Sequence, residues 1–279
     1  MADDGRLLVC ATPIGNLGDV SDRLRETLGA ADIVYAEDTR RAATLLQHVG
    51  ARPRVRSLFV GNETSRTDEL LASLAEGLTV ALITDAGMPA VSDPGSEAVR
   101  RAREAGHPVT VIPGPSAVTT AVVLAGFGAD RFVFEGFLPR KGRERSERLA
   151  TIAPEDRPVV LFVSPHRLVQ DLESIADATG IEREIAITRE LTKLHEEVWS
   201  GPIGVAIEEW RSREVKGELT VVVSPGPAKK MPVETAITEA RGLVAAGSSP
   251  SEAARRVADA TGVSRRSIYE ALIADQDRS

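Results

Sequence analysis

LLVCATPIGNLGD, at residues 7–19, is the stretch that most directly indicates the fold. Leu7–Ala11 is a short aliphatic run, as expected of a strand buried on both faces of a parallel sheet. The loop that follows contains a proline and two glycines, Gly15 and Gly18, which would let its backbone approach a ligand closely. A tight turn also needs glycine, so this loop alone does not separate a binding site from a turn.

The alternation of strand and helix continues through the first 115 residues. Strands are predicted at Leu7–Ala11, Ile33–Ala36, Val55–Val60, Val80–Ile83 and Val109–Ile112, and helices at Asp22–Leu28, Thr39–Val49, Ser65–Glu76 and Gly95–Ala105. Gly29, Gly50, Gly77 and Gly106 stand where these helices are expected to end. The pattern predicts a parallel sheet covered on both faces, so that residues 1–115 form an N-terminal α/β domain.

Residues 116–224 predict a second α/β domain with a mixed sheet, because strand-like runs become more frequent than helical ones. The strands are expected at Phe132–Phe137, Val159–Val163, Glu184–Thr188, Glu197–Ser200 and Leu219–Val223. The helices are expected at Ser116–Ala125, Arg143–Ile152, His166–Thr179 and Ile203–Trp210.

A proline-rich linker at residues 225–233 precedes a small C-terminal segment, 234–279. This segment predicts one helix at Glu234–Ala246, a second capped by Ser251 and a third capped by Ser264, with spacing that resembles a helix-turn-helix. Its expected core is Ala253, Ala254, Val257, Val263 and Ile268. The segment could contact nucleic acid, with Arg265 and Arg266 in the first turn of the last helix, or it could be a packing appendage.

The composition is that of a folded protein, with 42% hydrophobic and 27% charged residues in a chain of 279. The first apolar stretch is too short for a signal peptide, and no apolar run reaches the about 20 residues that span a bilayer. We therefore expect a cytoplasmic protein without a membrane segment. Cys10 is the single cysteine and the four histidines are scattered, so neither a disulfide nor a metal site is expected.

The net charge of −7 argues at first against a nucleic-acid partner. The charge is uneven, however, because residues 229–279 carry eight Lys or Arg against seven Asp or Glu. A basic run also lies within the acidic remainder and contains Arg140, Lys141, Arg143, Arg145 and Arg148. Local potential decides phosphate contact, so this run is either an RNA-binding loop or a solvated one.

Polar loops rich in glycine or proline follow the predicted strands at residues 37–41 (EDTRR), 84–95 (TDAGMPAVSDPG) and 113–117 (PGPSA). Ligands of open α/β sheets bind beyond the carboxyl ends of the strands, so a ligand site is expected at this edge. No GxGxxG fingerprint and no P-loop motif occurs, which disfavours a conventional dinucleotide site. Similar loops in the second domain, at residues 135–139, 164–167 and 189–196, suit a cleft between the two domains.

The sequence contains seven motifs in a fixed order. They are ATPIGNLGDVSDR, AEDTRR, TDAGMPAVSDPG, PGPSA, FEGFLPRKGRER, SPHR and RELTKLHEE. Together they resemble the ribosomal small-subunit 16S RNA (cytidine-2′-O)-methyltransferase family within the tetrapyrrole methylase superfamily. The similarity runs from about Leu7 to Val223, and the C-terminal helices resemble a segment found in part of this family. It implies the two-domain fold of class III S-adenosylmethionine-dependent methyltransferases, with the cofactor in the cleft, usually within a homodimer.

The resemblance also implies site residues. Cofactor contacts would fall on Thr84, Asp85, Ala86, Gly87, Met88, Ser116 and Ala117 of the first domain, and on Phe162, Val163 and Leu191 of the second. The loop from Pro13 to Asp19, with Gly15 and Asn16, would face the RNA of the small ribosomal subunit. No pyrophosphate has to be bound, which agrees with the missing dinucleotide fingerprint.

The chain departs from the family pattern in three motifs. Met88 stands where the family usually has threonine, Val60–Glu63 replaces a histidine-containing HxxNE, and Phe162 and Val163 precede SPHR where the family has YE. These changes affect individual contacts and leave Asp85, Gly114, Pro115 and Lys193 as in the family pattern.

A ribose hydroxyl is a weak nucleophile that a nearby base or cation would assist. Lys193, Glu190, Glu37 and Asp38 are the candidates, and a lysine in a dry cleft could act with a lowered pKa. Phosphate or substrate contacts are expected from Arg40, Arg140, Lys141, Arg143, His166 and Arg167. Two alternatives remain, a related enzyme acting on a small molecule or protein side chain, and a non-catalytic RNA-binding module.

Overall fold

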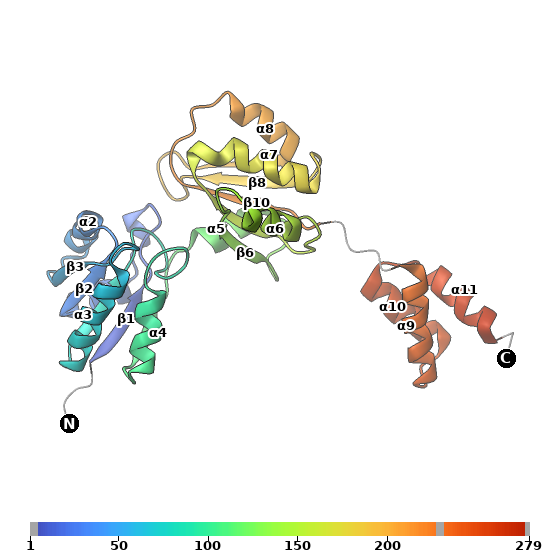
Figure 1. The fold of residues 1–279 in the computed structure, drawn as a ribbon, viewed down its shortest axis with the longest axis horizontal. Coiled ribbons are helices and arrows are strands. Elements are labelled where there is room, and N and C mark those ends of the chain that lie inside the picture. The colour runs from blue at the N-terminus through green and yellow to red at the C-terminus, as the bar shows by residue number, and fades with distance from the viewer. Residues whose placement is uncertain (1–4, 227–231, 277–279) are drawn as a thin grey trace.

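The computed structural model describes residues 5–226 and 232–276. The strands form two five-stranded sheets, and the last three helices form a separate unit beyond the second sheet (Figure 1). Residues 227–231 of the predicted linker, and the last three residues of the predicted C-terminal segment, lie outside the described residues.

The first sheet contains β1 (Arg6–Cys10), β2 (Ile33–Ala36), β3 (Arg54–Ser57), β4 (Thr79–Ile83) and β5 (Val109–Ile112). Its order is β3-β2-β4-β1-β5 and every pair is parallel, as predicted. Side chains of β1 alternate between two cores. Cys10 faces a core with α1 (Asp22–Ala30) and α2 (Thr39–Val49), whereas Leu7 and Val9 face a core with α3 (Glu63–Ala75) and α4 (Ser96–Glu104).

The second sheet contains β6 (Val133–Phe137), β7 (Val159–Val163), β8 (Glu184–Arg189), β9 (Glu197–Pro202) and β10 (Leu219–Val223), in the order β6-β7-β10-β8-β9. Only β6 and β7 are parallel, so the predicted mixed sheet is confirmed. A core of aliphatic side chains and Trp210 joins it to α6 (Arg143–Ile152), α7 (Leu168–Thr179) and α8 (Ile203–Arg211). The connecting helix α5 (Ala117–Ala125) contacts β7, β8 and β10.

The last unit contains α9 (Val233–Ala245), α10 (Pro250–Thr261) and α11 (Arg265–Gln276), each packed against the other two. All five residues of its predicted core are buried. Ser249, rather than Ser251, caps α10, because its hydroxyl accepts the backbone N–H of Glu252 at 3.3 Å. Ser251 instead accepts a hydrogen bond from Arg265 at 3.1 Å.

Two further predictions were wrong in the N-terminal half. Gly29 lies inside α1, which continues to Ala30 before Ala31 caps it. The third strand ends at Ser57 instead of Val60. Beyond it the Asn62 side chain accepts the backbone N–H of Phe59 at 2.8 Å, and this local turn replaces further strand pairing.

Candidate active site

Loops from neighbouring strands meet at one edge of the first sheet, because β2, β4, β1 and β5 are adjacent and parallel. Two of these loops are bonded directly. The Thr12 N–H donates to the Gly87 carbonyl at 2.8 Å, and the Gly87 N–H donates to the Thr12 carbonyl at 3.1 Å. Gly87 has φ +77°, a left-handed conformation that glycine adopts without strain.

The second sheet contacts these loops closely. A Cβ on Gly15 would lie 2.4 Å from Lys193 Cγ and 2.9 Å from the Leu191 carbonyl oxygen, so only glycine fits there. Ile14 is buried in a core whose other members include Val160 and Ala186 of the second sheet. The space between the sheets is thus bounded by side chains from both.

A cavity of about 390 Å³ lies in this space. Nine of the ten predicted cofactor-binding residues line it: Asp85, Ala86, Gly87, Met88, Ser116, Ala117, Phe162, Val163 and Leu191. The Phe162 ring is held by Phe134, with ring centroids 5.0 Å apart, and by Phe137 at 5.6 Å. The lining is mainly apolar, with carboxyl groups at a few positions, which is typical of a small-molecule site.

A second cavity of about 420 Å³ adjoins the first. It is lined by Pro13 and Gly15 of the first loop, by Thr84, the tenth predicted cofactor residue, and by Lys193. Arg41 and Asp85 are among the residues that line both cavities. Two compartments with a common wall suit a reaction between two bound molecules.

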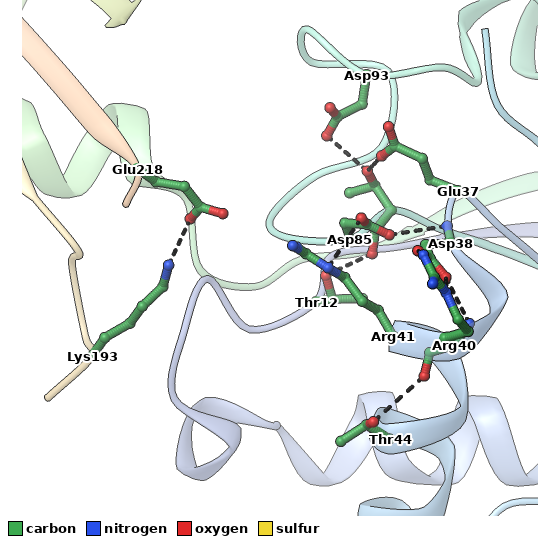
Figure 2. Close-up of polar contacts among 11 residues, drawn as sticks. Thr12, Glu37, Asp38, Arg40, Arg41, Thr44, Asp85, Asp93, Lys193 and Glu218 are labelled. Carbon is green, nitrogen blue, oxygen red and sulfur yellow. Dashed lines mark hydrogen bonds and ion pairs between the residues drawn. The ribbon is translucent and has the colours of Figure 1, made fainter. Parts of the chain in front are cut away.

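Carboxyl groups concentrate around Thr84, which directly follows β4. Figure 2 labels three of them, Glu37, Asp85 and Asp93. The Thr84 hydroxyl is 2.9 Å from Glu37 Oε2 and 2.8 Å from Asp93 Oδ2. Burial, together with the charges of Glu37, Asp85 and Glu218, outweighs the hydrogen bond from Thr84 and raises the pKa of Asp93 to about 6.

Asp38 is turned toward Arg40 rather than into either cavity. Its Oδ1 accepts the Arg40 backbone N–H at 2.8 Å and caps α2, and its Oδ2 accepts from Arg40 Nη2 at 2.6 Å. These bonds hold the pKa of the Asp38 carboxyl well below its usual range. The geometry therefore disfavours Asp38 as a proton acceptor and leaves Arg40, whose side chain is 90% exposed, outside both cavities.

Lys193 faces two carboxylates from the second half. Its Nζ donates to Glu190 Oε1 at 2.7 Å and to Glu218 Oε2 at 3.1 Å (Figure 2 shows the second bond). Burial lowers the pKa of Lys193, but the hydrogen bonds and charges of Glu190 and Glu218 outweigh it, and the pKa is raised overall. The expected lowering was wrong. Glu190 Oε1 also accepts the Glu218 backbone N–H at 2.9 Å, so this one oxygen accepts both hydrogen bonds.

The basic run divides into two parts. Arg145 is buried and bonds to Asp171 at 2.8 Å and to the Pro139 carbonyl at 3.0 Å, so it does not belong to the exposed part of the run. Arg148 contacts the Glu135 carbonyl at 2.9 Å. Arg140 and Lys141 are exposed, and their side chains have no partner within residues 5–226 and 232–276.

The other predicted substrate residues lie outside the two cavities. Arg143 pairs with Glu147 at 2.6 Å on the surface of α6, Arg167 bonds to Asp171 at 3.0 Å, and His166 is exposed. Asn16 accepts the Gly18 N–H at 2.9 Å and so caps a turn of 3₁₀ helix at Leu17–Asp19.

Among the charged side chains that line the first cavity, sequence reasoning missed three, Arg41, Asp93 and Glu218. Arg41 and Asp93 belong to quoted motifs that follow β2 and β4, and this position could have predicted that they line the site. Glu218 belongs to none of the quoted motifs. It is brought to the site by the pairing of β10 with β8 in the second sheet, which the sequence does not specify.

Within the described part of the chain, no group of His, Cys, Asp and Glu side chains is arranged to hold a metal ion. None of the helices found there combines the length and apolar character needed to cross a bilayer.

Comparison with known proteins gives consistent matches. The profile of the tetrapyrrole (corrin/porphyrin) methylases matches residues 6–206. A Synechocystis protein named ribosomal RNA small subunit methyltransferase I is 41% identical over 95% of this chain and 96% of its own. Relatives of the same name are 44% identical in Mycobacterium bovis (96% and 95%) and 43% identical in Thermotoga maritima (79% and 98%).

A solved structure of uroporphyrin-III-C-methyltransferase from Thermus thermophilus superposes with a TM-score of 0.59. It is 20% identical and covers 78% of this chain and 94% of its own, so it supports the fold alone. The fold class and the resemblance are confirmed. The chain belongs to the tetrapyrrole (corrin/porphyrin) methylase family, a family of methyltransferases.

Proposed function

We propose that the chain transfers a methyl group from S-adenosylmethionine to the ribose 2′-hydroxyl of a cytidine in 16S ribosomal RNA. The observation that carries this proposal is the near full-length similarity to relatives named ribosomal RNA small subunit methyltransferase I. The similarity includes the loops that build both cavities. A related activity on another acceptor, or RNA binding without catalysis, is an alternative outcome of the test below.

The first cavity fits the proposed cofactor. Apolar side chains and the Phe162 ring suit a nucleoside, while Glu37, Asp85, Asp93 and Glu218 give the cavity the negative character that favours a cationic sulfonium. When bound, S-adenosylmethionine would supply an activated methyl group. Asp85 is held in place by a hydrogen bond from the Asp38 backbone N–H at 3.0 Å and by an ion pair with Arg41 at 3.4 Å.

The second cavity is the proposed site of the acceptor nucleotide. Pro13 and Gly15 would bound it, and the ion pairs of Lys193 would keep that ammonium charged and near the acceptor. We assign Lys193 to binding and orientation of the acceptor, since its raised pKa opposes a role as base. Arg140 and Lys141, at the exposed start of the basic run, would contact RNA phosphates, with Arg40, Arg143, His166 and Arg167 as further surface contacts.

Assembly and location are part of the same proposal. Val111 of β5 and Val123 and Leu124 of α5 are exposed to 48%, 70% and 42%. Such apolar surface would be covered in a homodimer. We propose that a cytoplasmic homodimer acts on RNA of the small ribosomal subunit.

The test is methyl incorporation from labelled S-adenosylmethionine into small subunits purified from a strain that lacks the enzyme. After digestion to nucleosides, the label is expected in 2′-O-methylcytidine. Label in a base-methylated nucleoside, or transfer to a tetrapyrrole or protein but not to RNA, would contradict the proposal. Cofactor binding without any transfer would favour the non-catalytic alternative.

A further inference from the structure

The Thr84 hydroxyl stands between two carboxyl groups, at 2.9 Å from Glu37 Oε2 and 2.8 Å from Asp93 Oδ2. In Figure 2, dashed lines from the labelled Glu37 and Asp93 meet at one unlabelled oxygen atom. A hydroxyl has one hydrogen and can donate to only one of these oxygens. The other contact is a hydrogen bond only when its carboxyl group is protonated and donates to Thr84. The Glu37–Thr84–Asp93 trio therefore has a complete set of bonds when it holds one added proton.

Backbone structure holds the trio in place. Glu37 and Thr84 directly follow the paired strands β2 and β4, in which Ala36 lies opposite Ile83. Asp93 returns to Thr84 through a loop in which Ala90 and Ser92 have φ of 68° and 64°. Non-glycine residues rarely adopt this conformation, and such backbone strain concentrates at functional sites.

Burial and neighbouring charges make Asp93 a proton acceptor near neutral pH. Burial, reinforced by the charges of Glu37, Asp85 and Glu218, raises the pKa of Asp93 to about 6. The two nearby cations are directed elsewhere, since Arg41 pairs with Asp85 at 3.4 Å and Lys193 with Glu190 and Glu218. A base whose pKa lies close to the working pH is suited to proton transfer.

The trio also lies at the boundary of the two compartments. Glu37 and Asp93 line the first cavity, and Thr84 lines the second. A proton that leaves a molecule in the second cavity therefore has a hydrogen-bonded acceptor in the wall beside it.

We propose that Asp93, linked through the Thr84 hydroxyl to Glu37, accepts the proton that the acceptor hydroxyl loses during methyl transfer. The hydroxyl oxygen forms a bond to the methyl carbon of a sulfonium donor while the carbon–sulfur bond breaks and its electron pair stays on sulfur. The O–H electron pair remains on oxygen, and the proton completes the bonds of the trio before release to water. This assignment rests on the proposed function.

The first test needs no catalysis. In the cofactor-free protein, the carboxyl ¹³C resonance of Asp93, assigned by its loss in Asp93→Asn, is expected to titrate near pH 6. Thr84→Val removes a bond that lowers the pKa and should move the midpoint upward, whereas Glu37→Gln removes a charge that raises it and should move the midpoint downward. A wild-type midpoint near 4, or no opposite shifts in the two variants, would overturn the proposal.

The second test is kinetic. Asp93→Asn keeps the size of the side chain and is expected to lower kcat about 100-fold or more, as loss of a general base does. The Kd for S-adenosylmethionine should rise no more than about threefold, because Glu37, Asp85 and Glu218 keep the first cavity negative, and the acid limb of the pH–kcat profile should disappear. Asp130→Asn, the same change at an exposed carboxylate outside both cavities, is the matched control and should leave kcat unchanged.

Retention of full kcat and of the acid limb in a folded Asp93→Asn protein would refute the role of Asp93. If the wild-type protein methylates a hydroxyl other than cytidine ribose, the proposed function fails, but the same pH profile still tests the trio. If it methylates no hydroxyl at all, both fail, even if Asp93 titrates near pH 6.

Discussion

The ionised form of Asp93 lowers the stability of the folded protein, but it is the form that can accept a proton. Its pKa is raised from 3.8 to about 6 in the folded protein, mainly because burial disfavours the charged form. The folded protein thus binds this proton more tightly than the unfolded chain does. The stabilising contribution is fully present below about pH 4 and is lost as the pH rises through about 6.

Asp93→Asn should therefore stabilise the protein at high pH while it impairs the reaction. The expected gain in the free energy of unfolding is about 1 kcal/mol at pH 8, allowing for solvent screening of a partly exposed group, and close to zero at pH 4. Urea unfolding of wild type and variant at both pH values measures the difference. An equal gain at pH 4 and pH 8 would mean that the ionised carboxylate is not the cause.

Sequence patterns predicted most of the residues that line the first cavity, but not which carboxyl groups could accept a proton. Asp85–Met88 and Phe162 were predictable because motifs at strand ends converge in any parallel sheet. The roles of Asp38 and Glu190 were not, because each depends on which cation its carboxylate meets, Arg40 or Lys193. Such pairings depend on side-chain geometry that spacing does not specify.

Among the elements, α6 and α7 support the loop that carries the exposed cations. The buried Asp171 of α7 accepts from Arg145 of α6 at 2.8 Å and from Arg167 at 3.0 Å. Arg145 in turn bonds to the Pro139 carbonyl, and Arg167 reaches the Arg140 carbonyl at 3.5 Å. A run of five basic residues is thus partly an internal support and partly a free surface, a division that charge patterning alone does not reveal.

Charge reversal at the free positions, Arg140→Glu with Lys141→Glu, should raise KM for RNA at least tenfold at physiological salt. Phosphate contacts position RNA but do not bind the cofactor, so the Kd for S-adenosylmethionine should not change. Arg143→Glu is the comparison on the same surface and should raise KM less, because Glu147 already pairs with this guanidinium. Steady-state kinetics with calorimetry of cofactor binding separates the two quantities. An unchanged KM would remove this loop from the RNA surface.

For the molecule as a whole, the alternation of strand and helix was sufficient to predict both sheets and the three-helix unit. The placement of the two sheets relative to each other was harder to predict from the sequence. The contact of Gly15 with Leu191–Lys193 joins segments that lie far apart in the chain. The Thermotoga maritima relative matches over 98% of its length but only 79% of this chain, as expected if the three-helix unit has no counterpart there.

A chain that ends after Gly226 should bind S-adenosylmethionine normally and bind RNA at least fivefold more weakly, with a shallower salt dependence. Ending there keeps the bonds from Arg183 to the Pro225 carbonyl and from Gly226 N–H to the Glu155 carbonyl. In the full chain, Arg255→Ala with Arg256→Ala should reproduce part of the loss, since both are exposed on α10 with no partner among the residues described. Equal affinity and equal salt slope would favour the packing role.

The central claim, transfer to a ribose hydroxyl, is tested most directly by deleting the attacking oxygen. Once the modified cytidine has been mapped, a small-subunit RNA with 2′-deoxycytidine at that one position can be compared with the unmodified RNA. We predict that the deoxy RNA binds with the same affinity but accepts no methyl group. Methyl transfer to the deoxy RNA at a rate similar to that of the normal substrate would place the acceptor on the base and contradict the account.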